Sequence, residues 1–286
     1  MRDMRHFIIL AASLFVFTGG LSQNSINQTR NTFNNYGKKT TKVVIPSTSL
    51  ADLMLRDAVN RSWRISPFEF CDVAEYEKIK QDTNYFFLMR VDGMYKKDLE
   101  PKIEYLTLIK GGTEIKRGLY SSHNIINLPI QQSEDLDGGN LFLIPAYVNI
   151  IQDHIYRIQE NVLLAFKGSL IYSDRVSKLK GKTILFSKDQ LGYDISDGEF
   201  ISLFKGKAKL VSASDIEEAV SNNRDKTAVA VVVIPRGGTK GSYCYKMIIT
   251  TDSHELLFLR RQKISKRSPA GFSAEDIRKI TVPFQF

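Results

Sequence analysis

The spacing of apolar residues along this chain predicts two long amphipathic helices. Apolar side chains recur every three or four positions over residues 51–59, directly after Ser49, and Asp52 takes the third position of a capping box. The same spacing runs over residues 147–165, behind Pro145, a residue that the first turn of a helix tolerates. Shorter capped helices are predicted at residues 72–79, 212–220 and 273–279.

Apolar runs of strand length separate these helices. They lie at residues 64–71, 85–91, 103–109, 183–186, 207–211, 228–234, 243–249 and 255–259. The valine-rich run 228–234 is typical of a central strand covered on both faces, with 85–91 as its counterpart. Pro67 predicts that the first run is an edge strand or carries a bulge. Helices that alternate with strands in this way indicate an α/β (α+β) fold.

One plan occurs twice along the chain. A strand ends at Cys71, Asp72 caps a short helix, and another strand follows; a second strand ends at Val211, with Ser212 in the place of Asp72. The repetition predicts two related α-β-α-β-β units with mixed sheets. Coincidence is the alternative, because capped short helices between strands are common in α/β proteins. The predicted halves are residues 43–132 and residues 133–286.

Residues 1–22 have the layout of a cleavable secretory signal. Arg2 and Arg5 precede an apolar run over residues 7–17, and small residues lead to cleavage after Ser22. The run is shorter than the roughly 20 residues that span a bilayer. A buried N-terminal helix is the alternative to a secretory signal. Because no cysteine lies at the cleavage site, we expect a periplasmic or secreted protein without a lipid anchor or a transmembrane segment. The polar residues 23–42 are expected to form a flexible leader.

The charge of the chain favours anionic partners. The formal net charge is +9, and Arg2, Asp3 and Arg5 contribute +1 of it, which leaves +8 after signal removal. An exported protein rarely meets nucleic acid, so the expected partner is another envelope protein or an anionic envelope component. Five cations crowd the last predicted hairpin and the following loop. These candidate contact residues are Arg260, Arg261, Lys263, Lys266 and Arg267. The alternative is that they protect an edge strand from aggregation.

No motif in the sequence predicts a catalytic, cofactor or metal site. Among the histidines after the signal, none has a partner three or four positions away, and His154 falls on the apolar stripe of a helix, which favours a hydrogen-bonded core residue. The acidic loop 134–137 lacks the full ligand spacing of a calcium loop. The Gly-Gly-Thr sequence at residues 237–239 precedes a strand, which favours a hairpin over a phosphate loop.

Two cysteines, Cys71 and Cys244, both lie in strand-like contexts. An oxidising compartment would allow them to pair, but a small buried thiol also suits either place, and we expect both thiols to be free. Pairing of a cysteine with a histidine for catalysis has no local support in the sequence.

Two resemblances accompany these patterns. The segments Leu53–Cys71, Tyr243–Met247 and Ser253–Leu256 resemble an uncharacterised family of exported Bacteroidales proteins, which implies no function. The succession of helix, strand, short helix, strand and hairpin, with its Thr-Asp-x-x-Glu-Leu turn at Thr251–Leu256, is similar to the N-terminal domain of TolB-type envelope proteins. That second resemblance implies a domain that binds other envelope proteins and performs no chemistry.

The sequence therefore predicts an exported, non-enzymatic protein that binds a partner protein or an envelope component. Two alternatives remain open, an enzyme or a small-ligand binding protein, each with a cleft between the two halves. Titratable side chains that converge in a pocket would favour the enzyme, whereas an open basic face or a free strand edge would favour partner binding.

Overall fold

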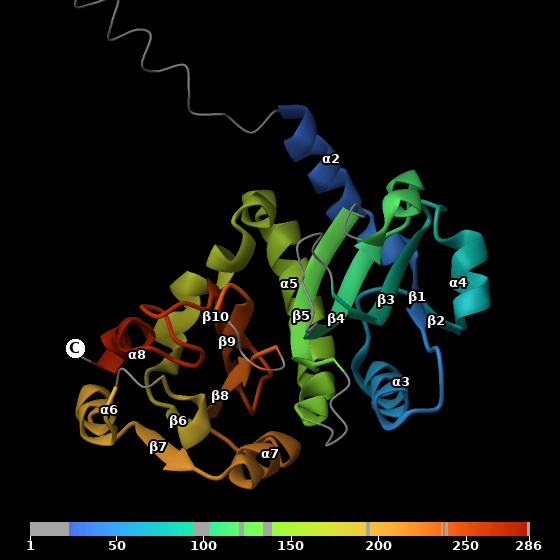
Figure 1. The fold of residues 1–286 in the computed structure, drawn as a ribbon. Helices are drawn as coiled ribbons and strands as arrows, with labels where there is room; N and C mark the ends of the chain where they lie inside the picture. The colour runs from blue at the N-terminus through green and yellow to red at the C-terminus, as the bar shows by residue number, and fades with distance from the viewer. Residues whose placement is uncertain are drawn as a thin grey trace, which may run out of the picture.

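Two five-stranded mixed sheets, flanked by helices, form the framework of the molecule and confirm the predicted α/β class (Figure 1). The structure, a computed structural model, describes residues 23–93, 103–119, 123–133, 139–192, 195–235, 237 and 240–284. The predicted signal, residues 1–22, and the acidic loop at residues 134–137 lie outside the described residues. Within the described part, no helix combines the length and the apolar character needed to cross a membrane.

The first sheet contains β1 (Thr40–Val44), β2 (Phe68–Cys71), β3 (Tyr85–Asp92), β4 (Ile103–Lys110) and β5 (His123–Gln132), in the order β2-β1-β3-β4-β5. Strand β1 pairs in parallel with β2 and β3, whereas β4 and β5 extend the sheet in antiparallel fashion. Helices α3 (Leu50–Ser62) and α4 (Val73–Ile79) connect the parallel strands, and α5 (Ile144–Glu160) follows β5.

The second sheet contains β6 (Thr183–Ser187), β7 (Ala208–Val211), β8 (Thr227–Val233), β9 (Tyr243–Thr250) and β10 (Leu256–Lys263), in the order β10-β9-β8-β6-β7. Its parallel and antiparallel pairings match those of the first sheet strand by strand. Helices α6 (Asp197–Phe204) and α7 (Ala213–Ser221) are its connections, and α8 (Ala274–Thr281) follows β10. Each unit therefore has the plan β-α-β-α-β-β-β-α.

The repeated plan in the sequence corresponds to equivalent positions in the two units. Cys71 and Val211 are the last residues of β2 and β7, and Asp72 and Ser212 follow them as the N-caps of α4 and α7. Both caps accept a hydrogen bond from the backbone amide three residues later. The predicted α-β-α-β-β unit was too short, because it omitted β1 and β5 in the first unit and β6 in the second unit.

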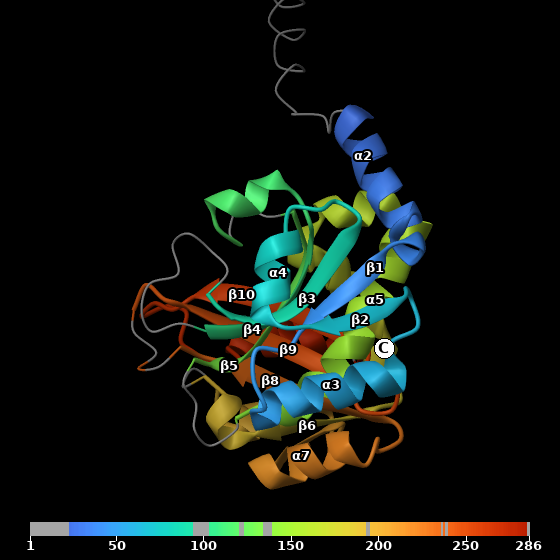
Figure 2. The ribbon, with the colours of Figure 1, turned by 90° about the vertical axis from the view of Figure 1, so that its right-hand side faces the viewer.

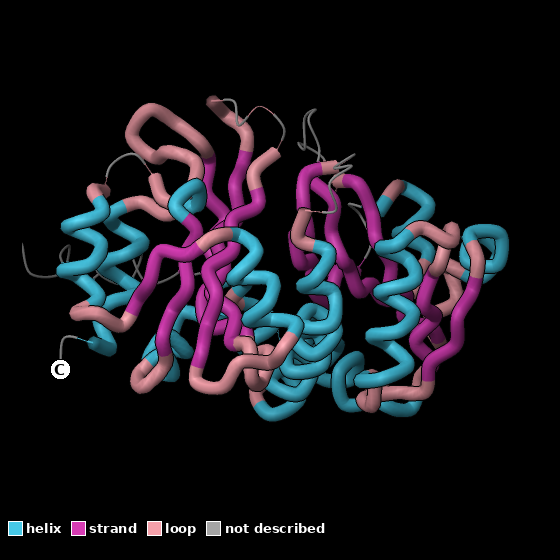
Figure 3. Tube along the Cα trace, turned by 90° about the horizontal axis from the view of Figure 1, so that it is seen from below, coloured by secondary structure: helices cyan, strands magenta, loops and turns pink. Residues whose placement is uncertain are grey.

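Helix α5 lies between the two sheets and packs against both (Figures 1 and 3). Its residues Ile151 and Ile155 share one core with Leu108 of β4 and Val231 of β8. Helix α4 covers the opposite face of the first sheet (Figure 2), and α6 and α8 cover the far face of the second. The predicted boundary at residues 132 and 133 assigns α5 to the second half, whereas the repeated plan makes α5 the last element of the first unit. Through α5 the two units share a continuous core.

The expectation of a flexible leader at residues 23–42 is wrong. This segment forms α2 (Gln23–Asn34), the 3-10 helix η1 (Tyr36–Lys38) and the start of β1. Phe33 and Tyr36 are buried, and the Gln159 side-chain amide donates a hydrogen bond of 2.8 Å to the carbonyl of Phe33. Two aromatic side chains in a polar background are enough to attach the segment to the core.

The long predicted helix ends earlier than its apolar stripe. Helix α5 stops at Glu160, and Asn161 caps the 3-10 helix η5 (Val162–Phe166), which leads into η6 (Gly168–Leu179). Further 3-10 segments among the described residues are η2 (Thr113–Arg117), η4 (Leu141–Leu143), η7 (Lys188–Gln190) and η8 (Val282–Phe284).

Candidate functional site

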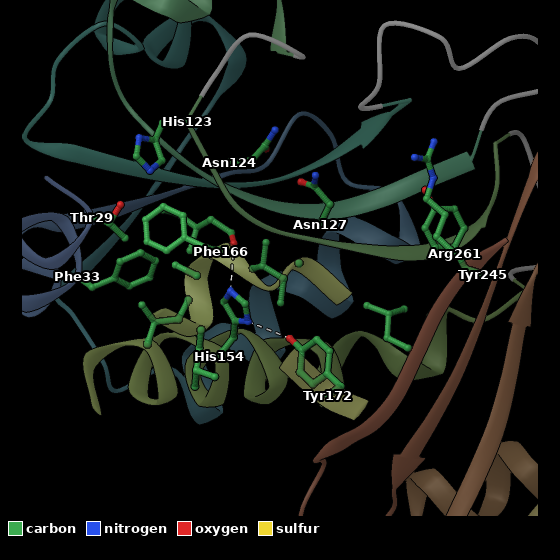
Figure 4. A pocket seen from close by; sticks show the side chains of 17 residues that line it. Thr29, Phe33, His123, Asn124, Asn127, His154, Phe166, Tyr172, Tyr245 and Arg261 are labelled. Atoms are coloured by element: carbon green, nitrogen blue, oxygen red, sulfur yellow. Dashed lines mark hydrogen bonds between the residues drawn. The ribbon is translucent and has the colours of Figure 1, made fainter. Parts of the chain in front are cut away.

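A cavity of about 540 Å³ lies between β5 of the first unit and β10 of the second. Helices α2 and α5 and the segments η5 and η6 complete its walls (Figure 4). Both alternatives left open by the sequence, an enzyme and a small-ligand binding protein, need such a cleft between the two units. The volume is within the range of small-molecule sites, which is about 300–1,000 Å³.

His154 of α5 lies in the wall of the cavity with both ring nitrogens engaged (Figure 4). Its Nε2 donates to the carbonyl of Ile125 in β5 at 3.1 Å, so Nδ1 accepts from the Tyr172 hydroxyl at 2.9 Å. Burial lowers the pKa of His154 to about 4, which keeps the ring neutral. The structure confirms a hydrogen-bonded core histidine, and this residue joins α5, β5 and η6.

Arg261 and Tyr245 form one end of the cavity (Figure 4). The guanidinium of Arg261 stacks over the ring of Tyr243, 3.9 Å from the ring centroid, and lies 5.9 Å from the centroid of Tyr245. Stacking on aromatic faces holds the planar guanidinium in a fixed orientation. Among the described residues that line the cavity, none is an aspartate or a glutamate.

The opposite end of the cavity is mainly apolar, with the polar side chains of Thr29 and His123 beside the apolar ones (Figure 4). Phe33 of α2, Ile158 of α5, and Leu164 and Phe166 of η5 supply most of this wall. A cation at one end and mainly apolar side chains at the other make the cavity amphipathic along its length.

The edge strand β5 borders the cavity but is capped by side chains. Besides the contact from His154, the Tyr147 hydroxyl donates to the carbonyl of Pro129 at 2.7 Å, and the Asn140 amide donates to that of Ile130 at 3.1 Å. These bonds occupy carbonyls that a further strand would need. His123, at the start of β5, has a lowered pKa, caused first by desolvation from surrounding protein atoms and then by the positive charge of Lys110.

The structure does not bring the five predicted contact residues together. Arg260 and Arg261 are neighbours on β10 whose side chains have different partners, and Arg260 forms ion pairs with Glu275 and Asp276 of α8. Lys263, Lys266 and Arg267 are exposed at the end of β10 and in the following turn. Only Arg261 lines the cavity.

A buried ion pair, which the sequence analysis missed, fixes α8 to the second sheet. Lys246 Nζ lies 2.6 Å from Asp276 Oδ2, and neither side chain is exposed to solvent. Burial raises the pKa of Asp276, but the hydrogen bond and charge of Lys246 outweigh it and hold the pKa below its usual value. Asp276 also accepts from the backbone amide and hydroxyl of Ser273, the N-cap of α8. Lysine within an apolar strand pattern is the only signal that could have indicated this pair.

Both cysteines are free and buried, as expected. Burial raises the pKa of Cys71 to about 11 and also raises that of Cys244, so neither thiol is activated. The groups that shift these pKa values include no histidine. In the described part of the chain, no cluster of three or more histidine, cysteine or acidic residues offers a metal site.

The remaining sequence candidates have structural roles. His254, in the turn between β9 and β10, is half-buried, and its Nδ1 accepts from the Asn149 amide at 2.8 Å. Gly237 belongs to the connection between the antiparallel strands β8 and β9, which confirms a hairpin loop. The cavity is thus the site with the strongest geometric support. No family model matches the chain, and comparisons with curated proteins and with solved structures found no match either.

Proposed function

We propose that this chain is a non-catalytic binding protein that holds an amphipathic anion in the cavity between its two units. The observation that carries the proposal is the guanidinium of Arg261 at one end of a cavity whose other end is apolar. A fatty acid, or another molecule with one anionic group on a hydrocarbon chain, has the matching distribution of charge. Its carboxylate would pair with Arg261, and its chain would lie against Phe33 and Phe166.

The polar groups around the cavity support binding rather than catalysis. A hydrolytic or transfer reaction needs a nucleophile within hydrogen-bond reach of a base. His154 is neutral, and its ring nitrogens are hydrogen-bonded to the phenol of Tyr172 and to the backbone carbonyl of Ile125. Neither of these partners is an activated nucleophile. These groups instead position the walls, as ligand sites require.

Competition with a fluorescent fatty acid tests the proposal. Laurate should displace the probe. Arg261→Gln should lower the affinity for laurate by at least about tenfold, since a charged hydrogen bond contributes roughly 1.5–3 kcal/mol. The same variant should change the affinity for dodecanol little, because dodecanol has the same chain length without the charge. Lys263→Gln is the matched control, because it removes one exposed positive charge from the same strand. Absence of saturable binding, or equal effects of the two variants, would refute the proposal.

A second function, contact with an anionic envelope component or an acidic envelope protein, is supported by the joint exposure of Lys263, Lys266 and Arg267. Replacing the three by Gln should reduce cosedimentation with envelope fragments at low salt and have little effect at high salt.

The export signal at residues 1–22 supports a periplasmic or secreted location. The matching strand orders support an origin of the two units by duplication.

A further inference from the structure

The side-chain amide of Asn127 in β5 is held in one orientation by the neighbouring strand. Thr107 of β4 lies opposite Asn127 in the strand register, and its hydroxyl donates a hydrogen bond to Asn127 Oδ1. The same hydroxyl lies 3.3 Å from the carbonyl of Ile126, and Thr107 is fully buried. Because Oδ1 is turned towards Thr107, the amide nitrogen Nδ2 is directed away from it.

The amide nitrogen of Asn127 is available to a molecule in the cavity. Asn127 lines the cavity and is half-buried. Among the residues that the structure describes, none accepts a hydrogen bond from Nδ2, and this atom is not one of the enclosed side-chain nitrogens that lack a partner. An amide nitrogen carries two donors. The cavity wall therefore presents an uncharged donor group in addition to the guanidinium of Arg261.

The strand register places this amide towards Arg261. Tyr105 precedes Thr107 by two residues on β4, within a regular stretch of the pairing with β5. Residues two apart in a strand lie on the same face, about 7 Å from each other. The Tyr105 hydroxyl bonds to that of Tyr245, and the Arg261 guanidinium lies 5.9 Å from the centroid of the Tyr245 ring. Asn127 accordingly lies between His123 and Arg261 along the cavity (Figure 4).

We propose that Asn127 is a second binding residue for the anion, donating from Nδ2 to one oxygen of the head group while Arg261 pairs with its charge. This inference rests on the proposed function and narrows the class of ligand. Asn127 belongs to the first unit and Arg261 to the second, so the head group bridges the two units. A head group with at least two acceptor oxygens, such as a carboxylate, satisfies both donors.

Competition with the fluorescent fatty acid tests the role of Asn127. Asn127→Leu keeps the size of the side chain and removes both donors. It should lower the affinity for laurate by about tenfold, the typical contribution of a hydrogen bond to a charged group. Asn124→Leu is the matched control, because Asn124 lines the cavity from the same strand but lies nearer to His123 (Figure 4). The control should change the affinity by less than about twofold.

Two further measurements do not depend on the stability of Asn127→Leu. Thr107→Val removes the hydroxyl that orients the amide and should lower the affinity for laurate by about threefold, because the amide must then be ordered on binding. In the wild-type protein, laurate should move a side-chain amide proton resonance of Asn127 downfield. The corresponding resonances of Asn124 should stay in place.

The outcomes separate this inference from the proposed function. If Arg261→Gln weakens laurate binding but Asn127→Leu does not, or if Asn124→Leu causes an equal loss, the role of Asn127 is overturned and the proposed function stands. Tighter binding after Asn127→Leu would show that Oδ1 faces the anion, which also overturns the inference. Absence of saturable laurate binding in the wild type would refute the proposed function and the role of Asn127 together.

Discussion

Tyr105 of β4 and Tyr245 of β9 meet at the interface of the two units, where the Tyr105 hydroxyl donates a hydrogen bond of 2.8 Å to the Tyr245 hydroxyl. When the strand registers of the two sheets are aligned, these tyrosines occupy equivalent positions. Their rings are edge-to-face, with centroids 5.7 Å apart. The contact joins the two sheets and supports the wall on which Arg261 lies.

Tyr105→Phe removes this hydrogen bond and should lower the free energy of unfolding by about 1 kcal/mol. Urea unfolding of the variant, of Tyr245→Phe and of the double variant measures the coupling between the two hydroxyls. We expect a coupling energy of about 1 kcal/mol between the two hydroxyls. Additive effects of the two substitutions would show that the hydroxyls act separately.

Val231→Asp should prevent stable folding of the second unit. Val231 of β8 is buried in the core that the two units share, and an unpaired carboxylate there costs more than about 4 kcal/mol. Val232→Asp is the matched control, because Val232 is only half-buried and its carboxylate would reach solvent. Circular dichroism melting compares the two variants, and equal stability of both would contradict the burial pattern of β8.

His154 should make stability depend on pH. Its folded pKa of about 4 lies below the unfolded value of about 6.5, so the unfolded state binds the proton more tightly. The stabilisation is complete above pH 6.5 and is lost as the pH falls towards 4, on the order of 3 kcal/mol in total.

His154→Asn isolates this effect from the other histidines. The variant should be less stable at neutral pH, because the contacts with Tyr172 and Ile125 change, but its stability should fall less between pH 6.5 and 4. Parallel loss of stability in both proteins over that range would show that His154 does not titrate as proposed.

Lys246→Met breaks the buried ion pair with Asp276 and should destabilise the protein by about 3 kcal/mol, because one buried carboxylate loses a partner. Arg260 still pairs with Asp276, which limits the loss. Lys188→Met removes an exposed pair with Asp197 and should cost less than about 1 kcal/mol. Similar unfolding free energies for the two variants would contradict a structural role of Lys246.

Most elements of the fold were predictable because their signals are local. The N-caps Ser49, Asp72 and Ser273 and the valine run of β8 each indicate an element within a few residues. Strand β5 escaped prediction because Pro129 and its neighbouring bulges interrupt the alternation of apolar and polar residues. Helix α2 escaped because only its final turn contacts the core, through Phe33.

The candidate site was less accessible to sequence reasoning. Five cations in one stretch predicted a single basic surface, but consecutive residues of a strand point to opposite faces, so Arg260 joins α8 and Arg261 joins the cavity. The apolar end of the cavity comes from α2, α5 and η5, which are distant from Arg261 in the sequence. Only the packing of the two units brings these parts together.

The orientation of the bound anion in the cavity can be measured directly. A fatty acid with a photoreactive diazirine at its methyl end should label residues around Phe33 and Leu164–Phe166, and unlabelled laurate should suppress the labelling. Mass spectrometry of the digested protein locates the adduct. Labelling confined to the apolar end, with Arg261→Gln reducing its yield, is the predicted result; labelling elsewhere, or labelling that laurate does not suppress, would contradict the account.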